Sequence, residues 1–238
     1  KRQTLAWVME EITGQRLDDF LAERVWGPLG MTETLYTPPE GLRPRIAATE
    51  VDTLYRDGLV WGTVHDENAD AQGGVAGHAG LFSTAVDLSL FARMVLNDGD
   101  IPVQPDSPLK RDPPAQGEIP AQGATRGNGI SSSEPRLLQP ETIETFTRRY
   151  DVTSTRALGW DTPAPRSSSG VMLSDRAFGH TGFTGTSIWI DPELDLFVIL
   201  LTNRVNPTRE NTRLFPVRRQ VADQVARSVT DESVEARR

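Results

Sequence analysis

Hydrophobic residues near the start of the chain recur at helical spacing in two consecutive stretches. The first stripe is formed by Leu5, Val8, Met9 and Ile12. Gly14 is a suitable end for this first helix. A second stripe over residues 17–25 predicts another helix, which Pro28 and Gly30 end. We expect both stripes to pack into the core, because an amphipathic helix buries its apolar face.

Three further helices are predicted later in the chain. Residues 84–96 form a clear amphipathic stretch with Ser83 or Thr84 as its cap, and an Asn-Asp-Gly sequence follows it. Residues 140–146 begin with a proline and predict a short helix. Residues 215–229 predict a terminal helix that covers one face of a sheet. Its expected inward stripe consists of Val217, Val221, Val225 and Val229.

A β-hairpin is predicted near the C-terminal end. Residues 186–190 and 196–201 are rich in strand-forming residues, and Asp191-Pro192-Glu193 connects them. Residues 36–62 are expected to form loops with short extended pieces, and residues 63–80, rich in glycine and polar groups, to form loops. Residues 100–135 are rich in Pro, Gly, Gln and Ser, which is typical of a flexible surface insertion. The pattern agrees with a single partial domain over residues 1–238.

Composition excludes several classes of function. The chain has 25 basic and 33 acidic residues, a net charge of −8, and no cysteine. The charge argues against non-specific nucleic-acid binding, and the lack of cysteine rules out disulfides and thiolate metal sites. No apolar run approaches the roughly 20 residues that a membrane span needs. No metal or organic cofactor is implied, and the oligomeric state stays open.

Candidate chemistry gathers at the three histidines. His180 stands in Gly179-His180-Thr181-Gly182, directly before the hairpin. A histidine there can move a proton or orient a carboxylate, whereas the alternative is a structural histidine at a strand end. Glycine lets a substrate backbone approach closely, and strand N–H groups can serve as oxyanion donors.

The other two histidines lie in residues 63–80. His65-Asp66-Glu67-Asn68 places two carboxylates beside an imidazole, which suggests either acid–base work or a polar segment tied down by its own hydrogen bonds. A metal site would need further ligands at suitable spacing, and none is obvious. His78 lies in a tight glycine segment that leads to the helix at 84–96.

Four segments together resemble one known family. They are residues 12–14 with 28–32, residues 77–84, Leu158-Gly159-Trp160, and His180-Thr181-Gly182. In this order and spacing they are similar to the C-terminal portion of the serine β-lactamase-like superfamily, which contains class C β-lactamases, penicillin-binding proteins (DD-peptidases) and related esterases. The resemblance covers most of the chain except about residues 99–135.

The resemblance implies an α+β, β-lactamase/transpeptidase-like fold in which an antiparallel sheet is flanked by helices. It implies a serine hydrolase that acts by acyl transfer on a β-lactam, a D-alanyl peptide or an ester, with an extracytoplasmic location favoured. His180, Thr181 and Gly182 would be catalytic, and the Phe183 N–H would help form the oxyanion hole. Substrate binding would fall to Phe183 and Thr184, together with His65, Asn68 and His78.

The chain also departs from the family pattern. The family's nucleophile is the serine of Ser-x-x-Lys, followed by Tyr-x-Asn, and this sequence has no Tyr-x-Asn. Its one Ser-x-x-Lys, Ser107 to Lys110, stands in a Pro-rich stretch without an apolar helical pattern. We therefore expect the domain to be N-terminally incomplete and the 238-residue chain to be inactive alone. The alternative is a catalytically inactive or truncated member that binds peptide or cell-wall fragments.

Overall fold

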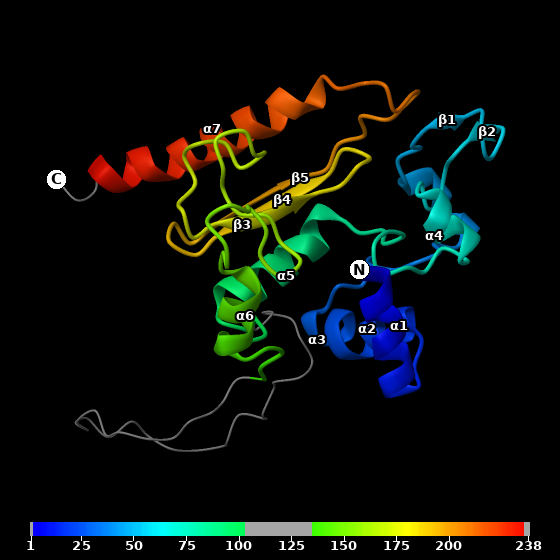
Figure 1. Cartoon of the computed structure of the whole chain (residues 1–238), viewed down its shortest axis with the longest axis horizontal. Coiled ribbons are helices and arrows are strands. Elements are labelled where there is room, and N and C mark those ends of the chain that lie inside the picture. Colours follow the sequence, from blue (N-terminus) through cyan, green and yellow to red (C-terminus); the bar gives the residue numbers. More distant parts are fainter. Residues whose placement is uncertain (1, 103–134, 236–238) are drawn as a thin grey trace, which may run out of the picture.

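The computed structural model describes residues 2–102 and 135–235, and its centre is a three-stranded antiparallel sheet (Figure 1). The strands are β3 (Phe178–Thr181), β4 (Ser187–Asp191) and β5 (Leu196–Leu200), in the order β3-β4-β5. His180 pairs with Ile188, and Trp189 pairs with Val198. The predicted hairpin is therefore confirmed, with residues 192–195 as its connection.

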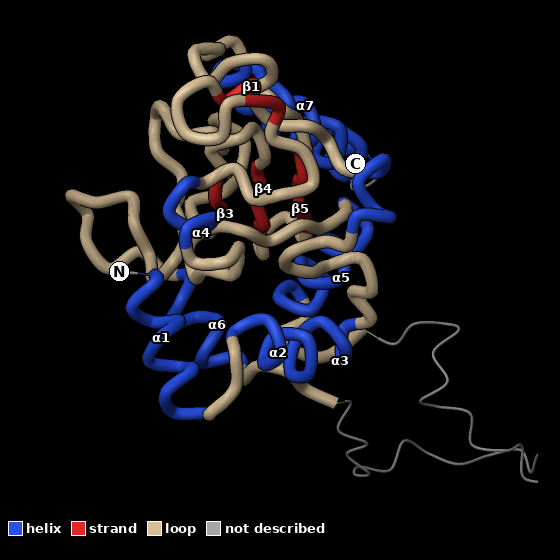
Figure 2. The backbone as a smooth tube through the Cα atoms, turned by 90° about the vertical axis from the view of Figure 1, so that its right-hand side faces the viewer, coloured by secondary structure: helices blue, strands red, loops and turns tan. Residues whose placement is uncertain are grey.

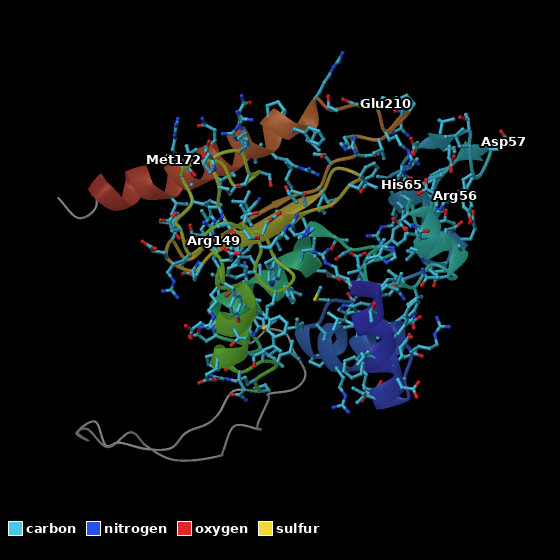
Figure 3. All side chains as sticks on the ribbon, viewed as in Figure 1. Arg56, Asp57, His65, Arg149, Met172 and Glu210 are labelled. Atoms are coloured by element: carbon cyan, nitrogen blue, oxygen red, sulfur yellow. The ribbon has the colours of Figure 1, made fainter. Side chains whose placement is uncertain are left out.

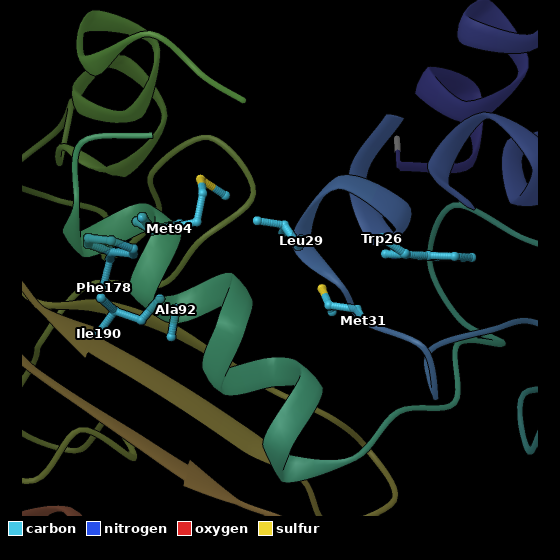
Figure 4. Packing of buried hydrophobic residues seen from close by; sticks show 8 residues of the cluster. Trp26, Leu29, Met31, Ala92, Met94, Phe178 and Ile190 are labelled. Carbon is cyan, nitrogen blue, oxygen red and sulfur yellow. The ribbon is translucent and has the colours of Figure 1, made fainter. Parts of the chain in front are cut away.

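Helices cover both faces of this sheet, as the family resemblance implied. Side chains alternate along β4, so Ile190 faces α5 (Ala85–Leu96) and Trp189 faces α7 (Leu214–Glu235). Figure 2 shows the strands between these two helices. The larger core cluster lies on the α5 side and is shown in Figure 4: Trp26, Leu29, Met31, Ala92, Met94, Val95, Phe178 and Ile190.

Of the N-terminal helices, only the last part, around Trp26 and Leu29, contributes buried residues to the main core cluster. The chain forms α1 (Arg2–Thr13), α2 (Leu17–Leu21), a π-helical turn (Ala22–Trp26) and α3 (Gly27–Leu29). The expectation that the first apolar stripe is buried is wrong, since Leu5 is 69% exposed and Ile12 is 79% exposed. Ala6 is the buried residue of α1, because the face of the helix that carries Ala6 packs against the main chain at Gly77.

Two of the later helices begin where their sequence signals stand. The Thr84 hydroxyl accepts a hydrogen bond from Asp87 N–H at 3.2 Å, so α5 starts at Ala85 behind this cap. The helix α6 (Pro140–Thr147) starts at its proline. Residues 99–101 bond to residues 135–137, with Ile101 N–H donating to Pro135 O. The predicted insertion therefore leaves and returns at one place, although residues 103–134 themselves lie outside the described residues.

The segments expected to be loops contain more regular structure than predicted. A 3₁₀-helix (Glu40–Arg45) and a small ribbon of β1 (Val51–Asp52) and β2 (Gly58–Leu59) occupy residues 36–62. The expectation of loops throughout residues 63–80 is wrong, because α4 (Glu67–Ala71) lies there. The Asp66 carboxylate caps it by accepting from Ala69 N–H at 2.9 Å. Five residues are too few for a helical hydrophobic period to show.

The terminal helix α7 uses a different inward stripe from the one predicted. Arg218, Ala222 and Ala226 are buried, whereas Val217 and Val229 are about 40% exposed. Ala226 packs with Trp189 and Leu173. Small residues face the sheet because the bulky indole of Trp189 already fills the space between the helix and the strands. Among the described residues, none of the helices has both the length and the apolar character that crossing a membrane requires.

Candidate active site

The edge of β3 and the turn behind it form the centre of the candidate site. The first part of this edge is covered, since Gly179 exchanges two main-chain hydrogen bonds with Asp161. The same edge continues past Thr181 into the turn 182–186, which Gly182 N–H closes by donating to Thr186 O at 2.8 Å. The Phe183 N–H has no hydrogen-bond partner among the described residues.

Two glycines allow this turn to exist. A Cβ atom at Gly182 would stand 2.2 Å from the Thr186 hydroxyl oxygen, and one at Gly185 would stand 2.5 Å from Thr202 O. Gly185 also has φ +134, a conformation that side chains rarely adopt. The sequence pattern Gly-Phe-Thr-Gly therefore specifies a tight turn that only glycine permits at both ends.

The His180 imidazole has one protonation pattern that fits its neighbours. Its Nδ1 lies 2.8 Å from Thr181 O, and its Nε2 lies 2.6 Å from Arg2 Nη2 and 3.3 Å from Arg156 Nη1. Guanidinium groups only donate, so Nε2 is the acceptor and Nδ1 carries the proton. The ring is a neutral imidazole held between one carbonyl and two cations.

The electrostatic surroundings of His180 favour this neutral form. Burial lowers the pKa of the His180 imidazole, and the nearby charge of Arg2 lowers it further. Arg2 also donates to Gly159 O at 3.2 Å, and Arg156 forms an ion pair with Asp161 at 3.1 Å. The Leu-Gly-Trp segment and the His-Thr-Gly segment, far apart in sequence, therefore meet at this imidazole.

His65 belongs to a second, buried cluster. Its Nε2 lies 2.7 Å from a carboxylate oxygen of Glu50, and both side chains are almost fully buried. Glu50 also accepts from Arg209, which in turn binds Glu67 at 2.7 Å. The hydrogen bond from Arg209 is the main reason that the pKa of the Glu50 carboxyl falls to about 2, opposed by burial and aided by His65. This cluster keeps the Glu50 carboxylate ionised at neutral pH.

The two clusters touch through Phe183. Its ring stacks on the His65 imidazole with 5.7 Å between centroids and 24° between planes. The main chain at His65 is fixed by Arg56, which donates to His65 O at 3.1 Å and to Val64 O at 2.9 Å (Figure 3). The segment around His65 therefore supports the turn that carries the Phe183 N–H.

The remaining predicted site residues contact partners other than His180. His78 Nε2 lies 3.1 Å from the Asp66 carboxylate, and His78 Nδ1 lies 3.3 Å from Gln3 in α1. Asn68 lies exposed on α4, and its carbonyl accepts from Gln72. Thr184 is held through its own carbonyl, which accepts from Arg204 N–H. No contact in the described part of the chain joins Asn68 or His78 to His180.

Sequence reasoning missed four charged residues of these clusters: Arg2, Arg156, Glu50 and Arg209. None stands in a recognisable motif, and Arg2 and Arg209 reach their partners across 178 and 159 positions of the chain. Only the rule that buried carboxylates and imidazoles need partners could have indicated that such residues exist. In the described part of the chain, no three His, Asp or Glu side chains are arranged to hold a metal ion.

Comparison with known proteins identifies the family of the chain. The family model described as Beta-lactamase matches residues 3–223. A protein of Escherichia coli K12 named "Putative D-alanyl-D-alanine carboxypeptidase" is 32% identical over 231 residues, covering 89% of this chain and 46% of that protein. The chain thus spans about half the length of the curated relatives it matches.

Solved structures show the same fold. A beta-lactamase from Mycobacterium bovis superposes with a TM-score of 0.57 at 18% identity, covering 96% of this chain and 62% of that one. A penicillin-binding protein homologue from Caulobacter crescentus superposes with a TM-score of 0.58 at 14% identity, covering 94% and 53%. Both likenesses confirm the β-lactamase/transpeptidase-like architecture implied by the sequence.

Proposed function

Because the chain belongs to the beta-lactamase family of serine hydrolases, we propose that it forms the substrate-binding edge of an enzyme that hydrolyses D-alanyl peptides through an acyl-enzyme. The observation that carries this proposal is the open edge at Thr181 and Phe183 beside two guanidinium groups. An extended peptide can lie along such an edge, and Arg2 and Arg156 can attract its terminal carboxylate. The curated relatives are named for D-alanyl-D-alanine carboxypeptidase, which agrees with this substrate.

We assign the individual residues the following roles in this proposal. The Phe183 N–H, which has no partner in the part of the chain that the structure describes, can stabilise the oxyanion of a tetrahedral intermediate, and Gly182 keeps the approach open. Thr181 and Thr184 can hydrogen-bond the peptide. His180 acts mainly as an acceptor that orients Arg2 and Arg156, since its lone pair is engaged by both. His65 supports Phe183 by stacking on its ring, whereas no contact in the described part of the chain brings Asn68 or His78 to this edge.

We propose that the acylating serine is not Ser107. The segment containing Ser107 and Lys110 lies outside the described residues, and its sequence favours no buried helix that would bring the two side chains together. The test is labelling of the product of the whole native gene with fluorescent penicillin. We expect the Ser107→Ala variant to label like the wild type, and stoichiometric labelling at Ser107 would overturn this assignment.

The substrate assignment is tested with two substrates in the same native gene product. Replacing Arg156 by Met is expected to raise KM for a peptide ending in a D-alanyl carboxylate by about 10-fold, with little effect on a neutral ester. Arg176→Met, which removes an exposed arginine beside β3 and away from His180, is the matched control. Equal effects of Arg156→Met on both substrates would argue against carboxylate recognition.

The role of His180 is tested in the same assay. We expect His180→Ala to lower turnover at least ~10-fold, because Arg2 and Arg156 would lose the acceptor that orients them towards the substrate. Wild-type turnover in this variant would remove His180 from the site. Binding of the peptide without any hydrolysis by the native gene product would instead favour the inactive, cell-wall-binding alternative.

A further inference from the structure

A hollow of about 520 Å³ lies between α5, α6 and the start of β3, at the opposite end of that strand from the turn 182–186. The described residues that line it include none from the substrate edge at 180–184. Its size falls within the roughly 300–1,000 Å³ of small-molecule pockets. We call it the α6 pocket, and the apolar part of its lining includes Leu96, Ile143 and Phe178.

One end of the α6 pocket carries two arginines that are held by neutral partners. Arg149, which is labelled in Figure 3, donates through Nε to the Thr162 hydroxyl at 2.8 Å and through Nη2 to Pro163 O. The Arg148 guanidinium lies 4.6 Å from the centroid of the Tyr150 ring. Neither arginine forms an ion pair within the described part of the chain, and Arg149 Nη1 has no hydrogen-bond partner there. Both positive charges therefore remain available to an anion.

The other end of the α6 pocket is acidic. Glu141 and Glu144 lie in the first half of α6, and Asp98 lies just after α5. None of these three carboxylates forms an ion pair with another described residue. The one arginine close to them, Arg136, is paired with Asp100 at 2.6 Å, so it offsets only part of the negative charge. This end of the pocket therefore attracts a cation.

The distance between the two charged ends is set by the length of α6. Glu141 and Thr147 are separated by ~9 Å along the helix axis, at a rise of ~1.5 Å per residue, and the two arginines follow directly. An extended chain of three residues spans about 10 Å, because each residue adds at most ~3.3–3.6 Å. Asp175 and Arg176 also line the pocket, but as chain neighbours of opposite charge they leave this polarity unchanged.

We propose that the α6 pocket binds a short peptide of about three residues whose two termini are both free. The amino terminus lies at the glutamates of α6, and the carboxylate lies at Arg148 and Arg149, whose planar groups suit it. An apolar side chain in the middle of the peptide lies against Phe178. A single amino acid is too short to reach both ends. The inference goes beyond the proposed function, which concerns the edge at Thr181 and Phe183.

The test measures by calorimetry how the product of the whole native gene binds the tripeptide Ala-Leu-Ala, which consists of L-residues and has no D-alanine end. We expect binding at millimolar concentration or below. The N-acetylated peptide and the C-terminally amidated peptide should each bind about 10-fold more weakly, because each lacks one of the two charges. The proposal is overturned if the doubly capped peptide, or free leucine, binds as tightly as the free tripeptide.

A variant at the basic end locates the peptide. Arg149→Met is expected to weaken the free tripeptide about 10-fold and to leave the amidated peptide unchanged, because only the free peptide presents a carboxylate. Arg213→Met, which removes an exposed arginine just before α7 and outside the pocket, is the matched control. Weakening by Arg156→Met but not by Arg149→Met would place the peptide at the substrate edge and overturn the proposal.

A variant at the acidic end keeps the test decisive if Arg149→Met does not fold, as circular dichroism would show. Glu144 is exposed and its carboxylate has no partner in the described part of the chain, so Glu144→Gln should fold. It is expected to weaken the free tripeptide several-fold without affecting the N-acetylated peptide, and Glu11→Gln on the exposed side of α1 is its control. Equal effects on both peptides, or none on either, would contradict the proposal. None of these measurements depends on hydrolysis, so their failure would leave the proposed function untouched.

Discussion

At the scale of single residues, the Glu50 carboxylate is a clear case of a charge that stabilises the fold. It accepts hydrogen bonds from Arg209 and His65 while almost fully buried. We expect Glu50→Gln to lower the free energy of unfolding at pH 7 by about 2 kcal/mol, since it weakens charge-assisted hydrogen bonds. Glu40→Gln, which removes an exposed carboxylate paired with Arg43, should cost about 0.5 kcal/mol or less.

The pH dependence of this effect has a definite sign. The pKa of Glu50 in the folded protein, about 2, lies below its ordinary value of 4.5. Ionised Glu50 therefore stabilises the fold fully above about pH 4.5, and this contribution is lost as the pH falls towards 2. Urea unfolding of both proteins at several pH values should show the difference between wild type and Glu50→Gln shrinking over that window. A difference that stays constant down to pH 2 would contradict the assignment.

The His180 imidazole offers a direct test of its surroundings. Because burial and Arg2 both lower its pKa, the midpoint of its NMR titration should lie below 6.5. Arg2→Met removes one positive charge and should raise that midpoint. Arg24→Met, on the π-helical turn and paired with Glu23, should leave it unchanged. A wild-type midpoint above 6.5 would be incompatible with the neutral ring held by two guanidinium groups.

At the scale of elements, the hydrophobic patterns predicted where helices and strands occur better than they predicted which face of a helix is buried. The helix capped by Thr84 and the hairpin around Asp191 were predictable because both signals are local. The short α4 could not be found, since its five residues carry no period and only Asp66 marks its start. The inward face of α7 was mispredicted because the choice of alanine over valine depends on Trp189, a residue on a different element.

The candidate site shows the same division. The His-Thr-Gly triplet and the two turn glycines are local features, so sequence alone indicated where the strand edge and its turn lie. Most partners in the two clusters are not local: Arg2 lies 178 positions from His180, and Arg209 lies 159 positions from Glu50, although Glu50 lies only 15 positions from His65. Such contacts depend on the complete packing of sheet and helices, which no spacing rule encodes.

Truncation of a buried and of an exposed side chain in the N-terminal helices should change the free energy of unfolding by different amounts. Leu29 is 2% exposed within the main core cluster, and Leu29→Ala should cost about 2–5 kcal/mol of unfolding free energy in the 238-residue chain. Ile12 is 79% exposed, and Ile12→Ala should change the free energy of unfolding by about 0.5 kcal/mol or less. Urea denaturation measures both, and a comparable loss in the two variants would mean that the apolar face of α1 is covered.

At the scale of the whole molecule, the N-terminal and C-terminal parts of the chain share one hydrophobic core. They also share one set of polar contacts around the Glu50–Arg209 ion pair, which we call the Glu50–Arg209 seam. Trp26 and Leu29 lie in the same cluster as Phe178 and Ile190. Val51 N–H donates to Pro207 O at 2.9 Å, close to the Glu50–Arg209 pair. Neither part can lose its packing without exposing the buried side chains of the other, so we expect them to unfold together.

Fluorine NMR of protein labelled with 5-fluorotryptophan tests this cooperativity. Trp26 reports on the N-terminal helices and Trp189 on the interface between β4 and α7, and single Trp→Phe variants assign their two signals. We expect both native signals to lose intensity with the same midpoint in urea, because the shared core and the seam join the two regions. A Trp26 signal that disappears at lower urea than Trp189 would show that the N-terminal helices open first. The sheet with α5 and α7 would then be the stable unit, with the Glu50–Arg209 seam too weak to link the N-terminal helices to it.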